Sequence, residues 1–216
     1  MNKINYQKEL DKVIEVLQRQ GRVPRLLLHS CCAPCSSYVL EYLSQYFSIT
    51  VFYYNPNISP KEEYEARTQE VQRLIRELPA VHPIRFVEGK YDPECYYEAV
   101  RGHEKDPEGG ERCGICFEMR LREAAKLAAE GGYDWFTTTL TISPLKNAGR
   151  LNTIGQAMGE EYHVAFLPSD FKKKEGYKRS IELSAQYHLY RQNYCGCVFS
   201  KREREEQMQK ERQETS

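Results

Sequence analysis

Short apolar runs alternate with stretches of helical hydrophobic periodicity along most of this chain. The runs that we expect to form strands span residues 25–30, 48–54, 84–87, 133–140 and 163–167. The intervening stretches carry helical spacing or helix start and stop signals, at about residues 6–17, 36–46, 60–78, 94–100, 113–130, 147–158 and 177–190. Strands that alternate with helices form parallel sheets covered by helices. The sequence therefore predicts an α/β fold of Rossmann-like type, with three layers and helices on both faces of the sheet.

The segment Ser59-Pro60-Lys61-Glu62 is a typical helix start. It combines a residue suited to the N-cap, a proline suited to the first helical position and a glutamate three residues after the cap. We expect Ser59 to cap a helix that begins at Pro60 and ends near Leu78.

The length of 216 residues suits one sizeable α/β catalytic domain, which we expect to span residues 1–200. Residues 201–216 are almost all charged or polar, so we expect a solvated helix or a disordered tail with no core to join. The chain has 31 basic and 31 acidic residues. This balance argues against bulk electrostatic binding of nucleic acid, although it is compatible with a local basic patch.

The N-terminal segment, residues 1–20, is charged and lacks the apolar core and cleavage site of a secretory peptide. No apolar run reaches the length of about twenty residues that a membrane span needs. We therefore expect a cytoplasmic protein, in a compartment that keeps thiols reduced.

Eight cysteines fall into three tight clusters and one isolated position. The clusters are Cys31-Cys32-Ala33-Pro34-Cys35, Cys113-Gly114-Ile115-Cys116 and Cys195-Gly196-Cys197, and Cys95 stands alone. In a reducing compartment, grouped thiols more often bind metal or carry out redox chemistry than form structural bridges. We interpret Cys95 as a small buried residue.

Two of the clusters together supply four thiolates. Cys113 and Cys116 lie at an expected helix start, where two intervening residues let the turn wrap an ion and the helix dipole favours thiolates. With Cys31 and Cys32 they make the number of sulfur ligands that a tetrahedral zinc or a 4Fe-4S cluster requires. The count by itself does not choose between these two metals.

Cys195 and Cys197 flank a single glycine. A disulfide over so short a span departs from relaxed geometry and is easily reduced, which favours a redox-active pair. The alternative is that both are further metal ligands. Cys35 is a candidate ligand for a second metal or a reserve thiol.

Several polar residues follow the predicted strands. Ligands in open parallel sheets bind beyond the carboxyl ends of the strands, where we expect Cys31, Ser143 and Asp170 to meet. The candidate substrate-binding side chains, for phosphate contact or base stacking, are Lys146, Asn147, Lys172, Lys173, Arg191 and Tyr194. The alternatives are an N-capped helix after residue 146 and a solvated charged face at residues 172–174.

Five motifs of this chain resemble the epoxyqueuosine reductase family QueH, in order and over about residues 24–200. They are Leu28-His29-Ser30-Cys31-Cys32-Ala33-Pro34-Cys35, Glu111-Arg112-Cys113-Gly114-Ile115-Cys116, the stretch 137–147, Asp170-Phe171-Lys172-Lys173 and Tyr190-Arg191-Gln192-Asn193-Tyr194-Cys195-Gly196-Cys197. The long polar tail is the one departure.

The resemblance implies the last step of queuosine biosynthesis, the two-electron reduction of the epoxide of epoxyqueuosine in tRNA. It implies a 4Fe-4S cluster on Cys31, Cys32, Cys113 and Cys116, and a redox-active disulfide between Cys195 and Cys197. An additional iron is also implied, with Cys35 and Asp170 as the ligands to test. The implied partners are tRNAs that accept Tyr, His, Asn or Asp, modified at the wobble base, and an unidentified low-potential electron donor.

Two chemical routes are open for the epoxide. In one, an under-coordinated iron near Asp170 acts as a Lewis acid, electrons pass through the cluster and the Cys195/Cys197 dithiol recharges the site. In the other, a thiolate of that pair opens the ring and its neighbour resolves the adduct as a disulfide forms.

Two other function classes fit parts of the sequence. A tRNA sulfurtransferase that activates its substrate with ATP needs a Gly-rich or Ser-rich phosphate loop after the first strand, and the loop at 29–35 has no glycine. A non-catalytic, zinc-stabilised tRNA-binding protein would keep four thiolates but has no use for a strained dithiol.

Overall fold

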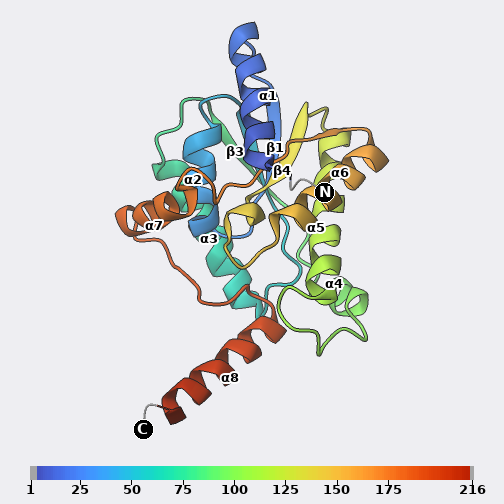
Figure 1. The fold of residues 1–216 in the computed structure, drawn as a ribbon, viewed down its shortest axis with the longest axis vertical. Coiled ribbons are helices and arrows are strands. Elements are labelled where there is room, and N and C mark those ends of the chain that lie inside the picture. Colours follow the sequence, from blue (N-terminus) through green and yellow to red (C-terminus); the bar gives the residue numbers. More distant parts are fainter. Residues whose placement is uncertain (1–3, 215–216) are drawn as a thin grey trace.

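The computed structural model describes residues 4–214, which contain a five-stranded sheet in the order β3-β2-β1-β4-β5 (Figure 1). The strands are β1 (Arg25–His29), β2 (Ser48–Tyr53), β3 (Ile84–Glu88), β4 (Trp135–Thr138) and β5 (Ala165–Phe166). Every neighbouring pair is parallel, and Leu28 of β1 lies between Val51 of β2 and Thr137 of β4. This arrangement confirms the predicted α/β class.

Helices cover both faces of the sheet, as the sequence predicts (Figure 1). Leu26 and Leu28 of β1 pack with the helices of one face, while Leu27 between them packs with those of the other. The first face carries α1 (Tyr6–Gln20), α2 (Ala33–Leu43) and α3 (Lys61–Glu77), with α7 (Gly176–Gln186) against α2. The second face carries α5 (Glu111–Glu130) and α6 (Ala148–Tyr162), with α4 (Pro93–Ala99) against α5.

Helix α2 begins inside the first cysteine cluster, three residues before the predicted start at residue 36. Cys32 is its N-cap residue and Pro34 lies in its first turn, where a proline loses no intrahelical hydrogen bond. Cys35 is therefore held on a helix and not on a loop.

The predicted cap of α3 is wrong by one residue. Pro60 occupies the N-cap and the helix begins at Lys61, with no side-chain cap. The Ser59 backbone amide instead donates a hydrogen bond to the Gly196 carbonyl oxygen, at 3.1 Å. This tertiary contact joins the start of α3 to the third cysteine cluster.

Strands β4 and β5 differ most from the predicted bounds, and both are shorter. β4 ends at Thr138, whose side chain accepts a hydrogen bond from the Leu140 amide and starts the 3₁₀ helix η1 (Thr139–Ile142). β5 begins at Ala165, because His163 adopts a left-handed conformation (φ 55°) that ends α6.

The C-terminal segment forms α8 (Val198–Glu214), which projects from the body of the molecule (Figure 1). A solvated helix is one of the two predicted alternatives, and one side chain of this segment also contacts the body of the protein. Glu203 pairs with the buried Arg112 of α5, at 2.7 Å. Because α8 starts before residue 201, the division into residues 1–200 and 201–216 stays a prediction.

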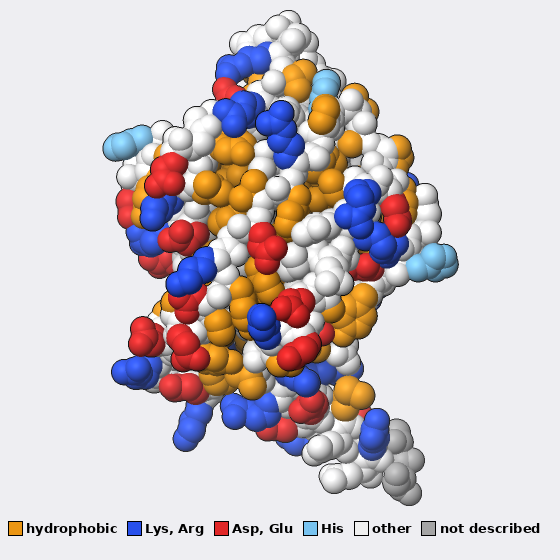
Figure 2. Space-filling view, turned by 180° about the vertical axis from the view of Figure 1, so that it is seen from behind, with side chains coloured by type: hydrophobic (Ala, Val, Ile, Leu, Met, Phe, Trp, Pro, Cys, Tyr) orange, Lys and Arg blue, Asp and Glu red, His pale blue; other side chains and the backbone are white. Residues whose placement is uncertain are grey.

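On the face drawn in Figure 2, acidic and basic side chains are interspersed around exposed apolar ones. Within residues 4–214, no helix is both long enough and apolar enough to cross a membrane.

Candidate functional site

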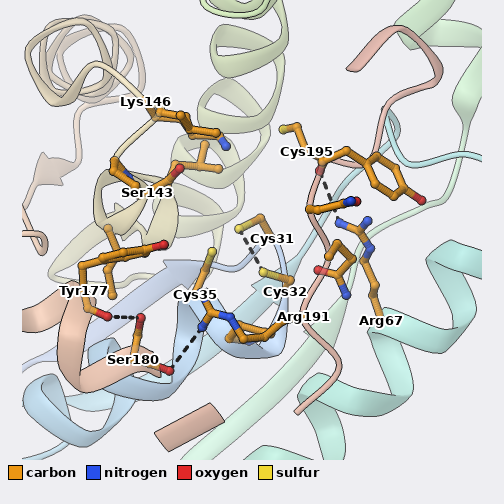
Figure 3. Close-up of a pocket in the computed structure, with 18 of the residues that line it drawn as sticks. Cys31, Cys32, Cys35, Arg67, Ser143, Lys146, Tyr177, Ser180, Arg191 and Cys195 are labelled. Carbon is orange, nitrogen blue, oxygen red and sulfur yellow. Dashed lines mark hydrogen bonds between the residues drawn. The ribbon is translucent and has the colours of Figure 1, made fainter. Parts of the chain in front are cut away.

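Two adjoining cavities lie at the carboxyl edge of the sheet. The first has a volume of about 250 Å³ and is lined by Cys31, Cys32 and Cys35 (Figure 3). The second has a volume of about 70 Å³ and is lined by Cys113, Cys116 and Cys197. The two cavities share four lining residues, Glu108, Leu145, Lys146 and Cys195. All three cysteine clusters therefore meet at the predicted edge.

Cys31, Cys32 and Cys35 form a thiol triad whose sulfur atoms all lie within 4.8 Å of one another. The Cys31 and Cys32 sulfurs are 3.8 Å apart, and the Thr139 hydroxyl lies 3.6 Å from the Cys31 sulfur. Three thiols so close together, on the loop after β1 and the first turn of α2, can hold a metal ion.

The triad favours one thiolate. Hydrogen bonds from the Cys32 and Cys35 thiols hold the pKa of Cys31 well below its usual range, and the nearby Lys146 ammonium adds to this effect. The same bonds keep the protons on the two donors, so the pKa of Cys32 rises to about 12 and that of Cys35 rises as well. Cys31 is therefore the thiol of the triad that most readily loses its proton, as a metal ligand must.

Buried polar contacts fix the loop that carries the triad. The His29 ring lies 2.9 Å through Nδ1 from the Thr138 hydroxyl and 3.1 Å through Nε2 from the Tyr54 carbonyl oxygen. Burial lowers the pKa of His29 to about 3, so the ring is neutral. The Ser36 hydroxyl donates to the Cys32 carbonyl oxygen at 2.8 Å.

Cys113 and Cys116 lie at the start of α5, as the sequence predicts. The Cys113 sulfur accepts a hydrogen bond from the Gly109 amide at 3.2 Å. Burial raises the pKa of Cys113, and it raises that of Cys116 to about 12. Without a metal or another cation, both groups are therefore neutral thiols at neutral pH.

The sulfur atoms of the four predicted ligands do not all lie close enough together to bind one metal ion. Cys113 and Cys116 lie outside the 4.8 Å group that the triad forms. A tetrahedral zinc with bonds of about 2.3 Å would place its sulfur ligands only about 3.8 Å apart. This arrangement does not suit one zinc ion held by Cys31, Cys32, Cys113 and Cys116.

Gly114, between the two α5 thiols, lies against the guanidinium of Arg150 from α6. A Cβ at this position would overlap that group. Arg150 donates to the Gly110 carbonyl oxygen at 3.1 Å and pairs with Glu111 at 2.8 Å. Gly114 thus lets Arg150 clamp the first turn of α5.

We expect Gly114→Ala to lower the free energy of unfolding by about 1–3 kcal/mol, the cost of an added methyl group in a packed site. In an open helix interior the same change would stabilise by about 1 kcal/mol. Urea unfolding of Gly114→Ala, Arg150→Ala and the double variant tests this. If Gly114→Ala destabilises the Arg150→Ala variant as much as it destabilises the wild type, contact with Arg150 is not the cause of the destabilisation.

The third cluster is held over the cavities by contacts with α3 and α8. Arg67 donates to the Cys195 carbonyl oxygen at 3.2 Å, and the Cys195 amide donates to the Ser200 hydroxyl at 2.8 Å. Gly196 has φ 119°, a conformation that suits glycine. Cys195 and Cys197 are free thiols here, so their disulfide stays a prediction.

The predicted substrate-binding residues fall into two sets. Lys146, Arg191 and Tyr194 line the first cavity. Asn147 lines the second cavity, but its side chain caps α6 by accepting from the Arg150 amide.

The remaining predicted site residues follow β5. Asp170 pairs with Lys172 at 2.9 Å, neither residue lines either cavity, and Lys173 is exposed. The roles of these three residues therefore stay predictions.

Several charged residues at the site were not predicted from the sequence. Arg67, Arg112 and Arg120 are each at most 3% exposed. Glu108 comes from a polar loop and lines both cavities. The arginines carried one local signal, since each falls on a helix position that the hydrophobic spacing assigns to the buried face.

The chain is similar to known proteins over most of its length. The family model described as Epoxyqueuosine reductase QueH matches residues 26–203. A Staphylococcus epidermidis protein named Epoxyqueuosine reductase QueH is 46% identical over 202 residues, covering 92% of this chain and 85% of the relative. The Streptococcus pyogenes protein of that name is 45% identical, with coverages of 92% and 78%. The Thermotoga maritima one is 37% identical, with coverages of 84% and 92%.

A solved structure supports the fold alone. It is described as the predicted subunit of a tRNA methyltransferase from Methanocaldococcus jannaschii, and it is 11% identical with a TM-score of 0.50. The match covers 76% of this chain and 74% of that one. The family match and the close relatives both span the three cysteine clusters, and the chain belongs to the epoxyqueuosine reductase QueH family.

Proposed function

We propose that this chain is an epoxyqueuosine reductase, an oxidoreductase that converts epoxyqueuosine in tRNA to queuosine. The family match and relatives that carry this name support the reaction. The structural observation that carries the proposal is the position of Cys195. Its thiol belongs to a pair that can supply two electrons, and it lines both the cavity of the thiol triad and the cavity of the α5 thiols.

The thiols would hold an iron–sulfur centre. Cys31 and Cys32 would supply ligands from the first cavity, and Cys113 and Cys116 would supply them from the second. Their spread beyond single-ion distance supports a multinuclear cluster over one zinc ion. When bound, such a centre supplies electrons one at a time.

Cys35 is the candidate ligand for an additional iron, because it completes the triad. Asp170 is its candidate partner, and its ion pair with Lys172 would have to open first.

The Cys195/Cys197 pair would supply the electrons and protons for the reaction. Removal of an epoxide oxygen as water, which leaves the alkene, needs two electrons and two protons. Oxidation of two thiols to one disulfide releases two electrons and two protons. The pair therefore supplies both the electrons and the protons that the reaction needs. An external low-potential donor would then reduce the disulfide and complete the cycle.

Charged groups at the junction of the cavities would bind the modified base and move protons. The Lys146 ammonium extends into the first cavity (Figure 3), and the facing sulfurs of Cys195, Cys31 and Cys35 keep its pKa above the usual range despite its burial. Lys146 would therefore stay charged and can donate a proton to the departing oxygen.

Tyr194 and Arg191 at the mouth of the first cavity would contact the nucleotide. The Arg67 guanidinium lies over the Tyr194 ring, 5.4 Å from its centroid, which holds that ring in place. The substrates would be tRNAs for Tyr, His, Asn and Asp, and the protein would act in the cytoplasm.

Anaerobic turnover tests the proposal. The purified protein, loaded with iron and sulfide, is mixed with tRNA containing epoxyqueuosine and a low-potential reductant, and the nucleosides are analysed. We expect queuosine to appear in proportion to the protein. Epoxyqueuosine that persists, although the protein retains its iron, would exclude this activity.

A further inference from the structure

Arg120 of α5 is a buried cation that pairs with no carboxylate of residues 4–214. Its side chain is 1% exposed, and it lines the second cavity. Nε donates to the Cys116 carbonyl oxygen at 3.1 Å and Nη1 to the Asn55 amide oxygen at 3.4 Å. Nη2 is buried with no hydrogen-bond partner among the described residues.

The two other buried arginines at the site differ from it. Arg67 pairs with Glu63 and Arg112 pairs with Glu203, each at 2.7 Å. A buried charge is costly unless an opposite charge faces it. Arg120 therefore needs an anion that the carboxylates of the described part of the chain do not supply.

Arg120 shares the second cavity with Cys116 and Cys195, and Cys195 also lines the first cavity. Burial by itself would lower the pKa of Arg120, but the charges of Cys116, Cys195 and Cys31 raise it. Cys31 lines the first cavity and Cys116 lines the second. The positive charge of Arg120 therefore interacts with thiols of both cavities.

We propose that Arg120 is the counter-charge of a single anionic metal–thiolate centre that bridges the two cavities. This inference rests on the proposed function, because it takes Cys31 and Cys116 as ligands of one centre. Arg120 acts as a positioning residue: its charge stabilises the bound anionic centre, and its bonds to Cys116 and Asn55 hold α5 against the loop after β2.

The test compares Arg120→Met and Arg120→Lys with the wild type, all loaded with iron and sulfide without oxygen. Retention of iron is measured against a competing chelator. We expect Arg120→Met to bind iron about 10–100-fold more weakly, the range for residues that support metal ligands. Arg120→Lys keeps the charge and should lie closer to the wild type.

Thermal unfolding with and without iron separates this role from simple packing. A centre that binds only the folded state raises Tm, and the rise is larger when the centre binds more tightly. We expect the rise in Tm on loading to be smaller in Arg120→Met than in the wild type. The reduction potential of any centre left in that variant should be lower, because a lost cation disfavours the more negative reduced form.

Arg122→Met is the matched control. This residue is also on α5, pairs with Glu118 and Glu161, and lines neither cavity. We expect it to retain iron like the wild type. Equal retention in Arg120→Met and the wild type, or an equal loss of Tm with and without iron, would overturn the inference. Wild-type protein that retains iron but does not reduce epoxyqueuosine would remove the proposed function and leave this inference standing.

Discussion

Cys116→Ser should lose the iron–sulfur centre and all measurable reduction of epoxyqueuosine. Mutation of a residue that only supports a metal ligand weakens metal binding by about 10–100-fold. Loss of a ligand itself should therefore weaken metal binding by at least about 100-fold. The buried Cys116 position offers no replacement within its own turn, because Cys113 would already be a ligand. Iron and sulfide content, visible absorbance and anaerobic turnover measure the loss.

Two matched variants sharpen this experiment. Cys95→Ser removes a thiol that lines neither cavity and donates to the Asp92 carbonyl oxygen, a bond that serine can keep. It should retain iron and activity. Cys35→Ser should keep the cluster and lose only the additional iron. If Cys35→Ser loses all iron while Cys116→Ser keeps it, the metal centre belongs to the thiol triad alone.

Cys195→Ser should reduce multiple turnover by at least about 1,000-fold, the scale on which enzymes lose activity when a reacting side chain is removed. A serine cannot form the disulfide with Cys197, so the two-electron exchange of the pair stops. The variant should keep its iron, because Cys195 is not among the four proposed ligands. Steady-state turnover with the low-potential reductant measures the loss.

A single-turnover experiment with the same variant separates the two chemical routes. The iron centre is reduced chemically, and one equivalent of epoxyqueuosine in tRNA is added. Formation of queuosine would exclude attack by the Cys195 thiolate and assign the pair to recharging the site. No product, together with full product from wild type treated identically, would favour direct thiol chemistry.

The elements of the fold were predictable where the signal is local. The alternation of strands and helices determined the parallel sheet, and Cys113 and Cys116 were predicted at the helix start that α5 provides. Some boundaries were missed by a few residues. Pro60, and not Ser59, is the N-cap of α3, and the Ser59 amide donates to the Gly196 carbonyl oxygen, a contact with the far end of the chain that local spacing does not contain.

The sequence by itself identified the cysteines to which we assign the chemistry. Cysteine spacing is a local property, and it marked all three clusters that meet at the cavities. The tertiary structure alone decided which charges face those thiols, because Arg120, Lys146 and Cys195 come from separate elements and meet only when the sheet is covered on both faces. The strength of an interaction between charges depends on their distance in space and on the exclusion of water. Residue spacing along the chain gives information about neither quantity.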